Sequence, residues 1–247
     1  MDLKDRIDKD KLPRHIALIM DGNGRWARQR GKERVFGHEN GVEAVRDTVK
    51  AAADTGIRYL TFFAFSTENW CRPQHEVSTL MDLLVDAIRN ESPELNENGV
   101  RLQAIGDLDS LPEHCRSQLA EAISLTAANN RLTVTVALSY SARWEIVNAA
   151  KNIAKKVASG EITPGQVDQE LLAGELLTRD MPDPDLLIRT SGELRLSNFL
   201  LWQLAYTELY FTPVFWPDFR RKHLYQAIID YQRRERRFGK VKNQVVL

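Results

Sequence analysis

The segment Asp21-Gly22-Asn23-Gly24-Arg25-Trp26 combines residue types that favour binding of a phosphate group. Its two glycines let the backbone approach a ligand closely and turn its N–H groups inward, and Arg25 supplies a forked donor for phosphate oxygens. The carboxylate of Asp21 would repel a diphosphate unless a hard cation lay between them. Mg²⁺ commonly binds through one or two carboxylates plus substrate phosphates. The segment therefore predicts a diphosphate that is bridged to Asp21 by Mg²⁺.

Three other interpretations of this segment stay open from its residues alone. Gly22-x-Gly24-x-x-Ala27 after an apolar run is similar to a dinucleotide-binding fingerprint, although an aspartate before the first glycine does not suit a metal-free pyrophosphate site. The letters D-G-N-G are also similar to part of an EF-hand loop, but Lys32 stands where that loop needs a bidentate Glu. The segment also fits a plain tight turn.

A second group of polar side chains follows a very apolar stretch, F-F-A-F. It supplies hydroxyl, carboxylate, amide and guanidinium groups from Ser66, Glu68, Asn69 and Arg72. Trp70 adds a flat apolar face, which suits contact with a hydrocarbon chain or shielding of a cationic transition state. The same residues also fit a loop with satisfied polar groups and a half-buried tryptophan. A nucleophilic role for Cys71 is not favoured, because nothing else in the sequence suggests thiolate chemistry.

Two arginines mark a third candidate binding segment. Arg189 and Arg195 bracket Ser191, Gly192 and Ser197. Arginines, hydroxyls and a flexible glycine suit a second diphosphate pocket. A surface loop with scattered charges is the alternative interpretation of this segment.

Other basic residues are weaker candidates. Arg34 and His38, which follow the first segment, are possible phosphate donors, although a lone histidine is more often structural. Near the end of the chain, a basic run is typical of a solvated helix face; it consists of Arg233, Arg234, Arg236 and Arg237.

Strand-like apolar runs alternate with helical patterns along the chain. The expected strands are 15–20, 58–65, 100–105, 131–138, 185–188 and about 208–211. Such alternation predicts a single α/β domain with a mostly parallel six-stranded sheet flanked by helices. Ligands of such folds bind beyond the carboxyl ends of the strands. Asp21, Ser66 and Arg189 each follow an expected strand directly, so we expect them at one edge of the sheet.

The helices are predicted from apolar residues that recur every three or four positions. The patterns cover 42–52, 77–88 and 146–157, Gly56 suits the end of the first, and a last helix is expected from about 219 to 238. Thr163-Pro164 is typical of a helix start. We expect residues 1–13 to be a flexible lead and residues 14–247 to be the functional domain.

Composition narrows the class of protein. The 247 residues are 43% hydrophobic, and 34 Lys and Arg balance 34 Asp and Glu. A neutral chain has no general attraction to nucleic acid, so no nucleic-acid partner is expected. The charged N-terminus has no signal-peptide core, and no apolar run is long enough to span a bilayer. With two cysteines, Cys71 and Cys115, expected to be free thiols, these features predict a soluble cytoplasmic protein.

Three segments, in this order on one α/β chain, resemble the motifs of the cis-prenyltransferases. They are H-I-A-L-I-M-D-G-N-G-R-W-A (15–27), F-S-T-E-N-W-C-R-P (65–73) and D-L-L-I-R-T-S-G-E-L-R-L-S-N-F-L-L-W-Q (185–203). The resemblance runs from about residue 14 to 239, and among bacterial members the chain is most like undecaprenyl diphosphate synthase. It implies a Mg²⁺-dependent transferase that adds isopentenyl diphosphate in cis to an allylic primer, usually farnesyl diphosphate. The implied product serves as the lipid carrier of peptidoglycan precursors.

The resemblance also implies roles for individual residues. Asp21 would coordinate Mg²⁺ with help from Glu208, and Asn69 stands where a proton acceptor has been proposed. The primer diphosphate would be held by Gly22, Asn23, Gly24, Arg25, Arg34 and His38, with Trp26 beside it. The second motif consists of Ser66, Thr67, Glu68, Trp70 and Arg72 with Asn69. Isopentenyl diphosphate would be held by Arg189, Arg195 and Ser197.

Further expectations concern the chain and its partners. A neutral amide has little basicity, so we expect Asn69 to orient a water or a phosphate oxygen. The strands at 58–65 and 131–138 and the helix at 77–88 are expected to line a hydrophobic tunnel, although core packing explains the same residues. The family forms homodimers, and Arg237-Phe238-Gly239 resembles an R-x-G element that reaches toward the partner's site. Product release implies a transient contact with a membrane surface.

The chain departs from the family pattern at three places. Ser139-Tyr140-Ser141-Ala142-Arg143 replaces the frequent Asn-Tyr-Gly-Gly-Arg, so the local backbone is expected to differ. Thr190-Ser191-Gly192 replaces a common Thr-Gly-Gly. Leu194 stands where some members carry His, so a metal role at that position is not inferred.

Four alternatives to a long-chain synthase are considered. A shorter-chain cis-prenyl diphosphate synthase would keep the same motifs. A Rossmann-type dinucleotide-binding oxidoreductase would use Glu68 for a ribose, but Asp21 argues against it. A non-catalytic subunit tends to lose the Asp and Asn motifs, which are present here. An all-helical trans-prenyltransferase needs D-D-x-x-D motifs, and the sequence contains no adjacent Asp pair.

Overall fold

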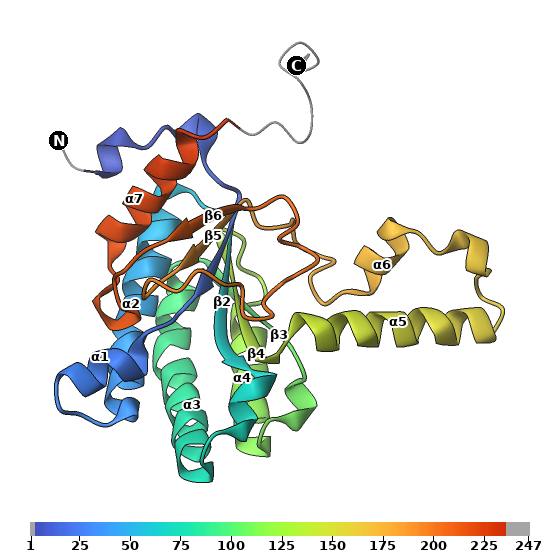
Figure 1. Cartoon of the computed structure of the whole chain (residues 1–247), viewed down its shortest axis with the longest axis horizontal. Helices are drawn as coiled ribbons and strands as arrows, with labels where there is room; N and C mark the ends of the chain where they lie inside the picture. Colours follow the sequence, from blue (N-terminus) through green and yellow to red (C-terminus); the bar gives the residue numbers. More distant parts are fainter. Residues whose placement is uncertain (1–2, 236–247) are drawn as a thin grey trace.

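The computed structural model describes residues 3–235, in which six strands form one central sheet (Figure 1). The strands are β1 His15–Ile19, β2 Tyr59–Ser66, β3 Val100–Ile105, β4 Leu132–Tyr140, β5 Leu186–Arg189 and β6 Glu208–Phe211. Their order is β3-β4-β2-β1-β5-β6, and every neighbouring pair is parallel. The predicted α/β fold with a six-stranded parallel sheet is therefore confirmed.

The central strands are apolar on both sides because the sheet is buried on both faces. In β1, Ile16 and Leu18 join one core cluster and Ala17 and Ile19 join the other. The register pairs Ile19 with Phe63 on one side and with Arg189 on the other. The carboxyl ends of β1, β2 and β5 therefore meet at one edge of the sheet.

Seven helices lie in the described part of the chain. They are α1 Asn23–Gln29, α2 Arg34–Thr55, α3 Gln74–Glu97, α4 Glu113–Thr126, α5 Ala142–Ala158, α6 Gln169–Glu175 and α7 Arg221–Gln232. Residues of α2, α3, α4 and α7 pack on one face of the sheet, and residues 199–204 pack on the other. Helices α5 and α6 pack together and project from the body as an arm (Figure 1).

The ends of the helices correct and confirm several expectations. The last helix was expected from about 219 to 238, but α7 begins at Arg221 and ends at Gln232, and 233–235 are not helical. Gly56 ends α2 in a left-handed conformation, φ 98°, as its position suggested. Thr163 caps only a short 3-10 turn, Pro164–Gln166, rather than a longer helix.

The N-terminal lead contacts the last helix. Residues 4–6 and 9–11 form two 3-10 turns, and Leu3, Ile7 and Leu12 pack against the core. Gln232 of α7 donates to the backbone oxygen of Asp8 at 2.6 Å, and its own Oε1 accepts from the Asp8 N–H at 3.1 Å. These contacts join the two ends of the described chain, while the expected flexibility of residues 1–13 stays a prediction.

The helices between residues 3 and 235 include none that is long and apolar enough to cross a membrane. Both cysteines are free thiols; Cys71 is exposed and Cys115 is buried. Burial raises the pKa of the Cys115 thiol, which disfavours its reactive thiolate form.

Candidate active site

Asp21 and Arg189 form the centre of a polar rim at the carboxyl edge of the sheet. Arg189 ends β5 and pairs with Ile19 at the end of β1, and its Nη2 donates to Asp21 Oδ2 at 2.9 Å. The Arg189 side chain is only 3% exposed, whereas that of Asp21 is 26% exposed and faces a cavity. A buried guanidinium needs such partners, because an uncompensated buried charge is very unfavourable.

Arg189 is fixed in place by the loop that follows it. Its Nη1 donates to Ser197 Oγ at 2.8 Å and also to the backbone oxygen of Arg195. Its Nε has no hydrogen-bond partner among the described residues. The predicted grouping of Arg189 with Ser197 is thus present, and one donor of this guanidinium is unused.

Glu193 joins the first and third polar segments. Its Oε1 accepts from Arg25 Nη1 at 2.8 Å, and its Oε2 accepts from Arg195. Arg25 also lies 3.3 Å from Asp21 Oδ1 and donates to Ser191 Oγ. These arginines lower the pKa of the Glu193 carboxyl, so it is ionised at neutral pH. Glu193 therefore holds two arginines that the sequence assigned to different diphosphates.

The glycines of the first segment allow close approach of neighbouring groups. Gly22 adopts φ 107°, and a Cβ there would lie 2.6 Å from Phe215. A Cβ at Gly24 would lie 3.2 Å from the guanidinium carbon of Arg34. Asn23 faces the cavity, and its buried Oδ1 has no partner within residues 3–235. The two glycines are thus needed for packing against Phe215 and Arg34, and binding of a ligand by the backbone of this turn stays a prediction.

Glu76 organises a second basic cluster at the start of α3. Its Oε1 accepts from Arg34 Nε at 3.2 Å and from Arg72 Nη1 at 3.1 Å, and the residue is 8% exposed. His38 lies between these groups. Burial, followed by repulsion from Arg72 and Arg34, lowers the pKa of His38 to about 4. The imidazole is therefore neutral at pH 7 and can offer a hydrogen bond but not a charge.

The second motif forms a tight turn after β2. Ser66 and Asn69 make a capping box, in which Asn69 Oδ1 accepts from the Ser66 N–H at 3.1 Å. Glu68 accepts from Asn198 Nδ2 at 3.0 Å. Burial alone would raise the pKa of Glu68, but hydrogen bonds, the first from Asn198, lower it. Thr67 Oγ1 lies 3.2 Å from Glu68 Oε2 and adds to this turn.

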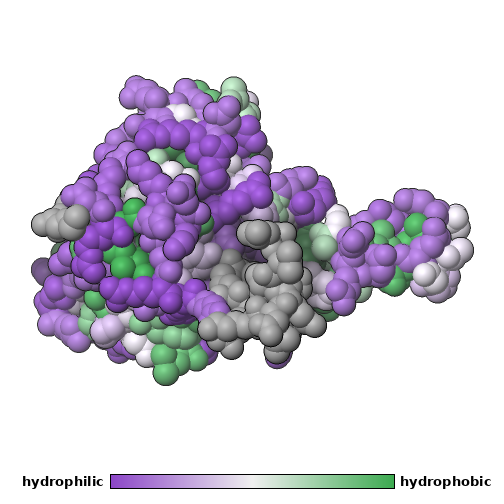
Figure 2. Space-filling model, turned by 90° about the horizontal axis from the view of Figure 1, so that it is seen from above, coloured by the Kyte–Doolittle hydropathy of each residue, from purple (hydrophilic) through white to green (hydrophobic). Residues whose placement is uncertain are grey.

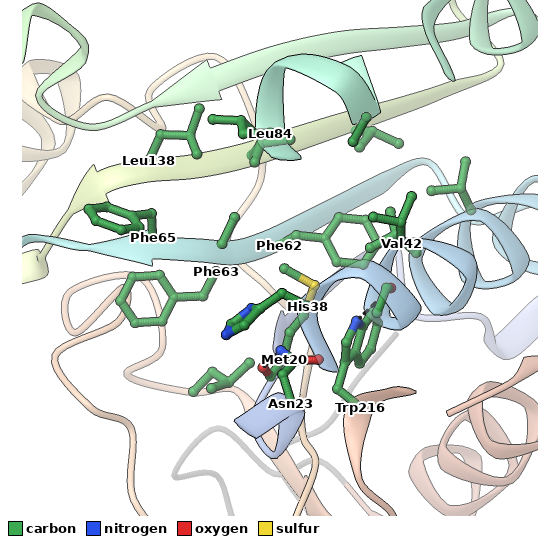
Figure 3. A pocket seen from close by; sticks show the side chains of 18 of the residues that line it. Met20, Asn23, His38, Val42, Phe62, Phe63, Phe65, Leu84, Leu138 and Trp216 are labelled. Atoms are coloured by element: carbon green, nitrogen blue, oxygen red, sulfur yellow. Dashed lines mark hydrogen bonds between the residues drawn. The ribbon is translucent and has the colours of Figure 1, made fainter. Parts of the chain in front are cut away.

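A cavity of about 1480 Å³ extends from the polar rim between the sheet and helices α2 and α3 (Figure 3). Figure 3 shows His38, Asn23 and Met20 near its polar part and Phe62, Leu84 and Leu138 around its apolar part. The sequence predicted apolar lining from β2, β4 and residues 77–88. Residues from all three line the cavity, including Ala64, Val136 and Met81. A continuous tunnel stays a prediction.

Two predicted aromatic site residues, Trp26 and Trp70, are not among the residues that line the cavity. Trp26 stacks on Phe36 at 5.7 Å and lies under Arg30, so it supports α1 and does not flank the cavity. Trp70 packs against Phe65 and donates to Ser139 Oγ at 2.9 Å.

Glu208 is placed away from Asp21 by the strand register. It pairs with Leu186, at the opposite end of β5 from Arg189, and its carboxylate contacts Arg234 at 2.9 Å. The structure therefore gives no support to a shared metal site of Glu208 and Asp21 in one chain. The R-x-G element at 237–239 lies outside the described residues.

The sequence reasoning missed residues that the structure brings to the rim. Glu76 and Glu193 link the arginines, while Asn198 and Arg143 line the cavity. Asn198 Oδ1 also accepts from the Arg143 N–H at 3.0 Å. Glu76 and Arg143 lie in the first turns of α3 and α5, where charged residues are ordinary, whereas Asn198 lies within the third motif. Glu193 lay within a quoted motif, and its position between two arginines was the available signal.

The departures from the family pattern have local structural consequences. Ser141 is extended, with φ −150°, and Ala142 begins α5, so neither position needs glycine here. Ser191 adopts φ 79°, a conformation that favours glycine, and it is buried beside Arg25.

The carboxylate of Asp21 is the group at this rim that suits a Mg²⁺ ion held together with substrate phosphates. Asp21 faces the cavity, and the described residues hold no cluster of three His, Cys, Asp or Glu side chains. Such a donor set matches Mg²⁺ bound mainly by substrate phosphates and water. The fold and the rim thus define an α/β protein with an arginine-rich edge above a large cavity that has an apolar part.

Comparison with known proteins agrees with this description. Residues 19–239 match the family described as "Putative undecaprenyl diphosphate synthase". The chain is 55% identical to an isoprenyl transferase of Heliobacterium mobile, covering 97% of this chain and 92% of the relative. It is 49% identical to the ditrans,polycis-undecaprenyl-diphosphate synthase ((2E,6E)-farnesyl-diphosphate specific) of Vibrio cholerae, with 97% and 96% covered.

A solved structure has the same fold. Lavandulyl diphosphate synthase from Lavandula x intermedia, in complex with dimethylallyl diphosphate, superposes with a TM-score of 0.91 at 38% identity, covering 94% of this chain and 100% of the other. The chain therefore belongs to the cis-prenyltransferase family and is a prenyltransferase. This membership excludes the oxidoreductase alternative, and the parallel sheet excludes an all-helical trans-prenyltransferase.

Proposed function

We propose that the protein condenses isopentenyl diphosphate units in cis onto farnesyl diphosphate and releases a long-chain polyprenyl diphosphate. The observation that carries this proposal is the position of two linked arginine clusters at the mouth of one large apolar cavity. The names of the relatives from Heliobacterium mobile and Vibrio cholerae support the same reaction class.

The first diphosphate subsite is proposed at the start of α1. Backbone N–H groups of Gly22, Asn23 and Gly24, together with Arg25, would bind an allylic diphosphate beside Asp21, which Arg25 contacts at 3.3 Å. Fixed donors at this position stabilise the charge that develops as the allylic C–O bond breaks. His38 and Arg34 would border this subsite.

The second subsite is proposed around Arg189, Arg195 and Ser197. Arg189 is rigid because three hydrogen-bond partners and deep burial hold it, so it can orient the diphosphate of the incoming unit. When the double bond of isopentenyl diphosphate is held near the allylic carbon, the reaction proceeds as if it were intramolecular, and its activation free energy is lowered. Asp21 lies between the two subsites and contacts an arginine of each.

Mg²⁺ is proposed to bind at Asp21 together with the phosphate oxygens. When bound, the ion would neutralise charge on the departing diphosphate. Asp21 would exchange a contact with Arg25 or Arg189 for the ion, which would leave that guanidinium available to the diphosphate.

Asn69 is proposed to position the proton acceptor. Its Oδ1 is occupied by the Ser66 N–H, which supports an orienting role and not a basic one. Replacement by Ala should lower turnover, measured as incorporation of isopentenyl diphosphate. Nearly normal turnover would remove Asn69 from the mechanism.

The product is proposed to be undecaprenyl diphosphate, the precursor of the lipid carrier for peptidoglycan. A cavity of about 1480 Å³ exceeds the roughly 300–1,000 Å³ of ordinary small-molecule sites, which favours a long product over a short one. A cytoplasmic location and release at a membrane surface stay predictions.

A homodimer is proposed as the working form. The described surface includes large exposed apolar side chains near the third motif and on the arm: Leu194, Tyr206, Leu209, Val147 and Leu177. Figure 2 shows hydrophobic areas along the projecting arm on an otherwise mostly hydrophilic face. Unpartnered apolar side chains on a projecting arm suit burial against a second copy.

The test is to incubate the pure protein with labelled isopentenyl diphosphate, farnesyl diphosphate and Mg²⁺ and to size the extracted lipid. We expect a long cis-polyprenyl product. A short product would overturn the undecaprenyl assignment and keep the reaction class, while no incorporation would overturn the proposed reaction.

A further inference from the structure

Helices α2 and α3 run side by side in the same direction away from the polar rim. Near the rim they are joined by Arg34 and Glu76. Farther along, Arg46 contacts Glu91 and Lys50 contacts Glu94. At 1.5 Å per helical residue, Arg46 lies about 18 Å beyond Arg34 along α2. We call the two remote ion pairs, Arg46–Glu91 and Lys50–Glu94, the charged seam.

The cavity lining changes character along these helices. Between the rim and the seam the lining residues of α2 and α3 are apolar: Val42, Val45, Leu80, Met81, Leu84, Ala87 and Ile88. At the seam the lining includes all four charged side chains of the two pairs. A hydrocarbon chain that grows from the rim therefore meets apolar surface first and fixed charges later.

The first pair of the seam is the stronger one. Arg46 donates from Nε to Glu91 Oε2 at 2.9 Å and from Nη2 to Glu91 Oε1 at 2.5 Å, and the Glu91 side chain is 18% exposed. Such two-point pairing fixes the geometry of both side chains. Covering these groups with hydrocarbon would remove them from water, which is unfavourable unless the pair stays intact.

The second pair lies where α3 is easiest to deform. Lys50 Nζ lies 2.7 Å from Glu94 Oε1, and both side chains are more than 40% exposed. Pro93 stands inside α3 between Glu91 and Glu94. Proline has no N–H for the helical hydrogen bond, so the helix is weakened at this point. The seam thus combines breakable ion pairs with a site where α3 can bend.

We propose that the charged seam limits the length of the polyprenyl chain that the cavity holds, which makes Glu91 and Glu94 specificity-determining residues. The cavity continues beyond the seam to Asp54 and Arg131, so a chain that outgrows the apolar lining must either separate these pairs or cover their charges with hydrocarbon. This inference rests on the proposed function, since it concerns the size of that product. The pair Asp54–Arg131, at 3.1 Å, ties the end of α2 to the start of β4 beyond the seam.

The test compares the double variant Glu91→Gln/Glu94→Gln, its two single variants and a matched control, all of nearly equal size. Glu91→Gln and Glu94→Gln each remove one charge of the seam. The matched control is Glu43→Gln, because Glu43 also contacts Arg46, at 2.6 Å, but lies on α2 itself and does not join it to α3. Each purified variant is given farnesyl diphosphate, labelled isopentenyl diphosphate and Mg²⁺, and the extracted lipids are sized.

We expect the double variant of Glu91 and Glu94 to raise the ratio of longer chains to the wild-type main product about fivefold, which corresponds to about 1 kcal/mol. Glu43→Gln should keep the wild-type distribution. An unchanged distribution in the double variant, with wild-type protein that elongates normally, overturns the seam proposal. Wild-type protein that makes no product at all overturns the proposed function instead.

A charge exchange keeps the test decisive if the double variant folds poorly. Lys50→Glu alone places two carboxylates together and should lengthen the product. Lys50→Glu combined with Glu94→Lys restores an ion pair and should return the distribution toward that of the wild type. If the exchanged pair gave the same long products as Lys50→Glu alone, the pairing itself would not limit length.

Discussion

The two ends of the cavity both carry ion pairs between arginine or lysine and a carboxylate, but they differ in burial and in number of partners. At the rim, Arg189 is 3% exposed and bonds Asp21, Ser197 and a backbone oxygen. At the seam, Lys50 and Glu94 are both more than 40% exposed. A buried charge with several hydrogen bonds is held in one position, where it can bind a ligand. The two side chains of an exposed ion pair separate at a small cost in free energy.

The largest effect is expected at Asp21. Asp21→Ala removes the proposed metal ligand and leaves Arg189 buried without its carboxylate, so turnover should fall about a thousandfold. Incorporation of labelled isopentenyl diphosphate measures this change. Asp109→Ala is a control, because the Asp109 side chain is 99% exposed. If Asp21→Ala retained turnover near that of the control, the rim would not be the active site.

The next effect is on stability. Glu76→Gln leaves Arg34 and Arg72 close together without their shared carboxylate. Because both arginines are partly exposed, we expect a loss of about 2 kcal/mol in the free energy of unfolding, below the full cost for a buried pair. Urea unfolding measures it. A loss below that of Glu94→Gln would reverse the proposed difference between rim and seam.

A smaller effect is expected from the pH dependence of His38. Its pKa falls from 6.5 to about 4 on folding, so the unfolded chain binds the proton more tightly. Stability is therefore fully present above pH 6.5 and is lost as pH falls toward 4. We expect about 1 kcal/mol of loss between pH 7 and pH 5 from this partly exposed group. His38→Gln should remove that part of the urea-unfolding difference; an unchanged difference contradicts it.

The smallest effect is expected at the seam. Glu94→Gln should change the free energy of unfolding by less than about 0.5 kcal/mol, because both partners are exposed to water. The same variant should still alter product length. A stability loss as large as that of Glu76→Gln would mean that the seam is a structural clamp.

The strands could be predicted from sequence because buried parallel strands are continuous apolar runs. Runs such as 15–20 and 100–105 match β1 and β3 closely. The grouping of Asp21, Ser66 and Arg189 at one edge of the sheet was predicted from the rule that parallel strands end at the same edge. The sequence does not distinguish residues that line the cavity from residues of the packed core, because side chains such as Leu84 and Phe62 suit both environments.

The differences between the expected and the observed positions have physical causes. Glu208 was expected near Asp21, but only the register of β5 and β6 shows that it lies at the opposite end of the strands. Trp26 and Trp70 pack against Phe36 and Phe65, so their contact with a substrate stays a prediction. Glu76 was missed because an acidic residue in the first turn of a helix is ordinary.

The central claim is that Asp21 tolerates a diphosphate because a divalent ion lies between them. Titration calorimetry with inorganic pyrophosphate tests it directly, using wild-type protein and Asp21→Asn with Mg²⁺ or with a chelator. With Mg²⁺ the wild type should bind at least about tenfold more tightly than the variant, and with the chelator the variant should bind more tightly. Equal wild-type binding with and without Mg²⁺ would contradict the account.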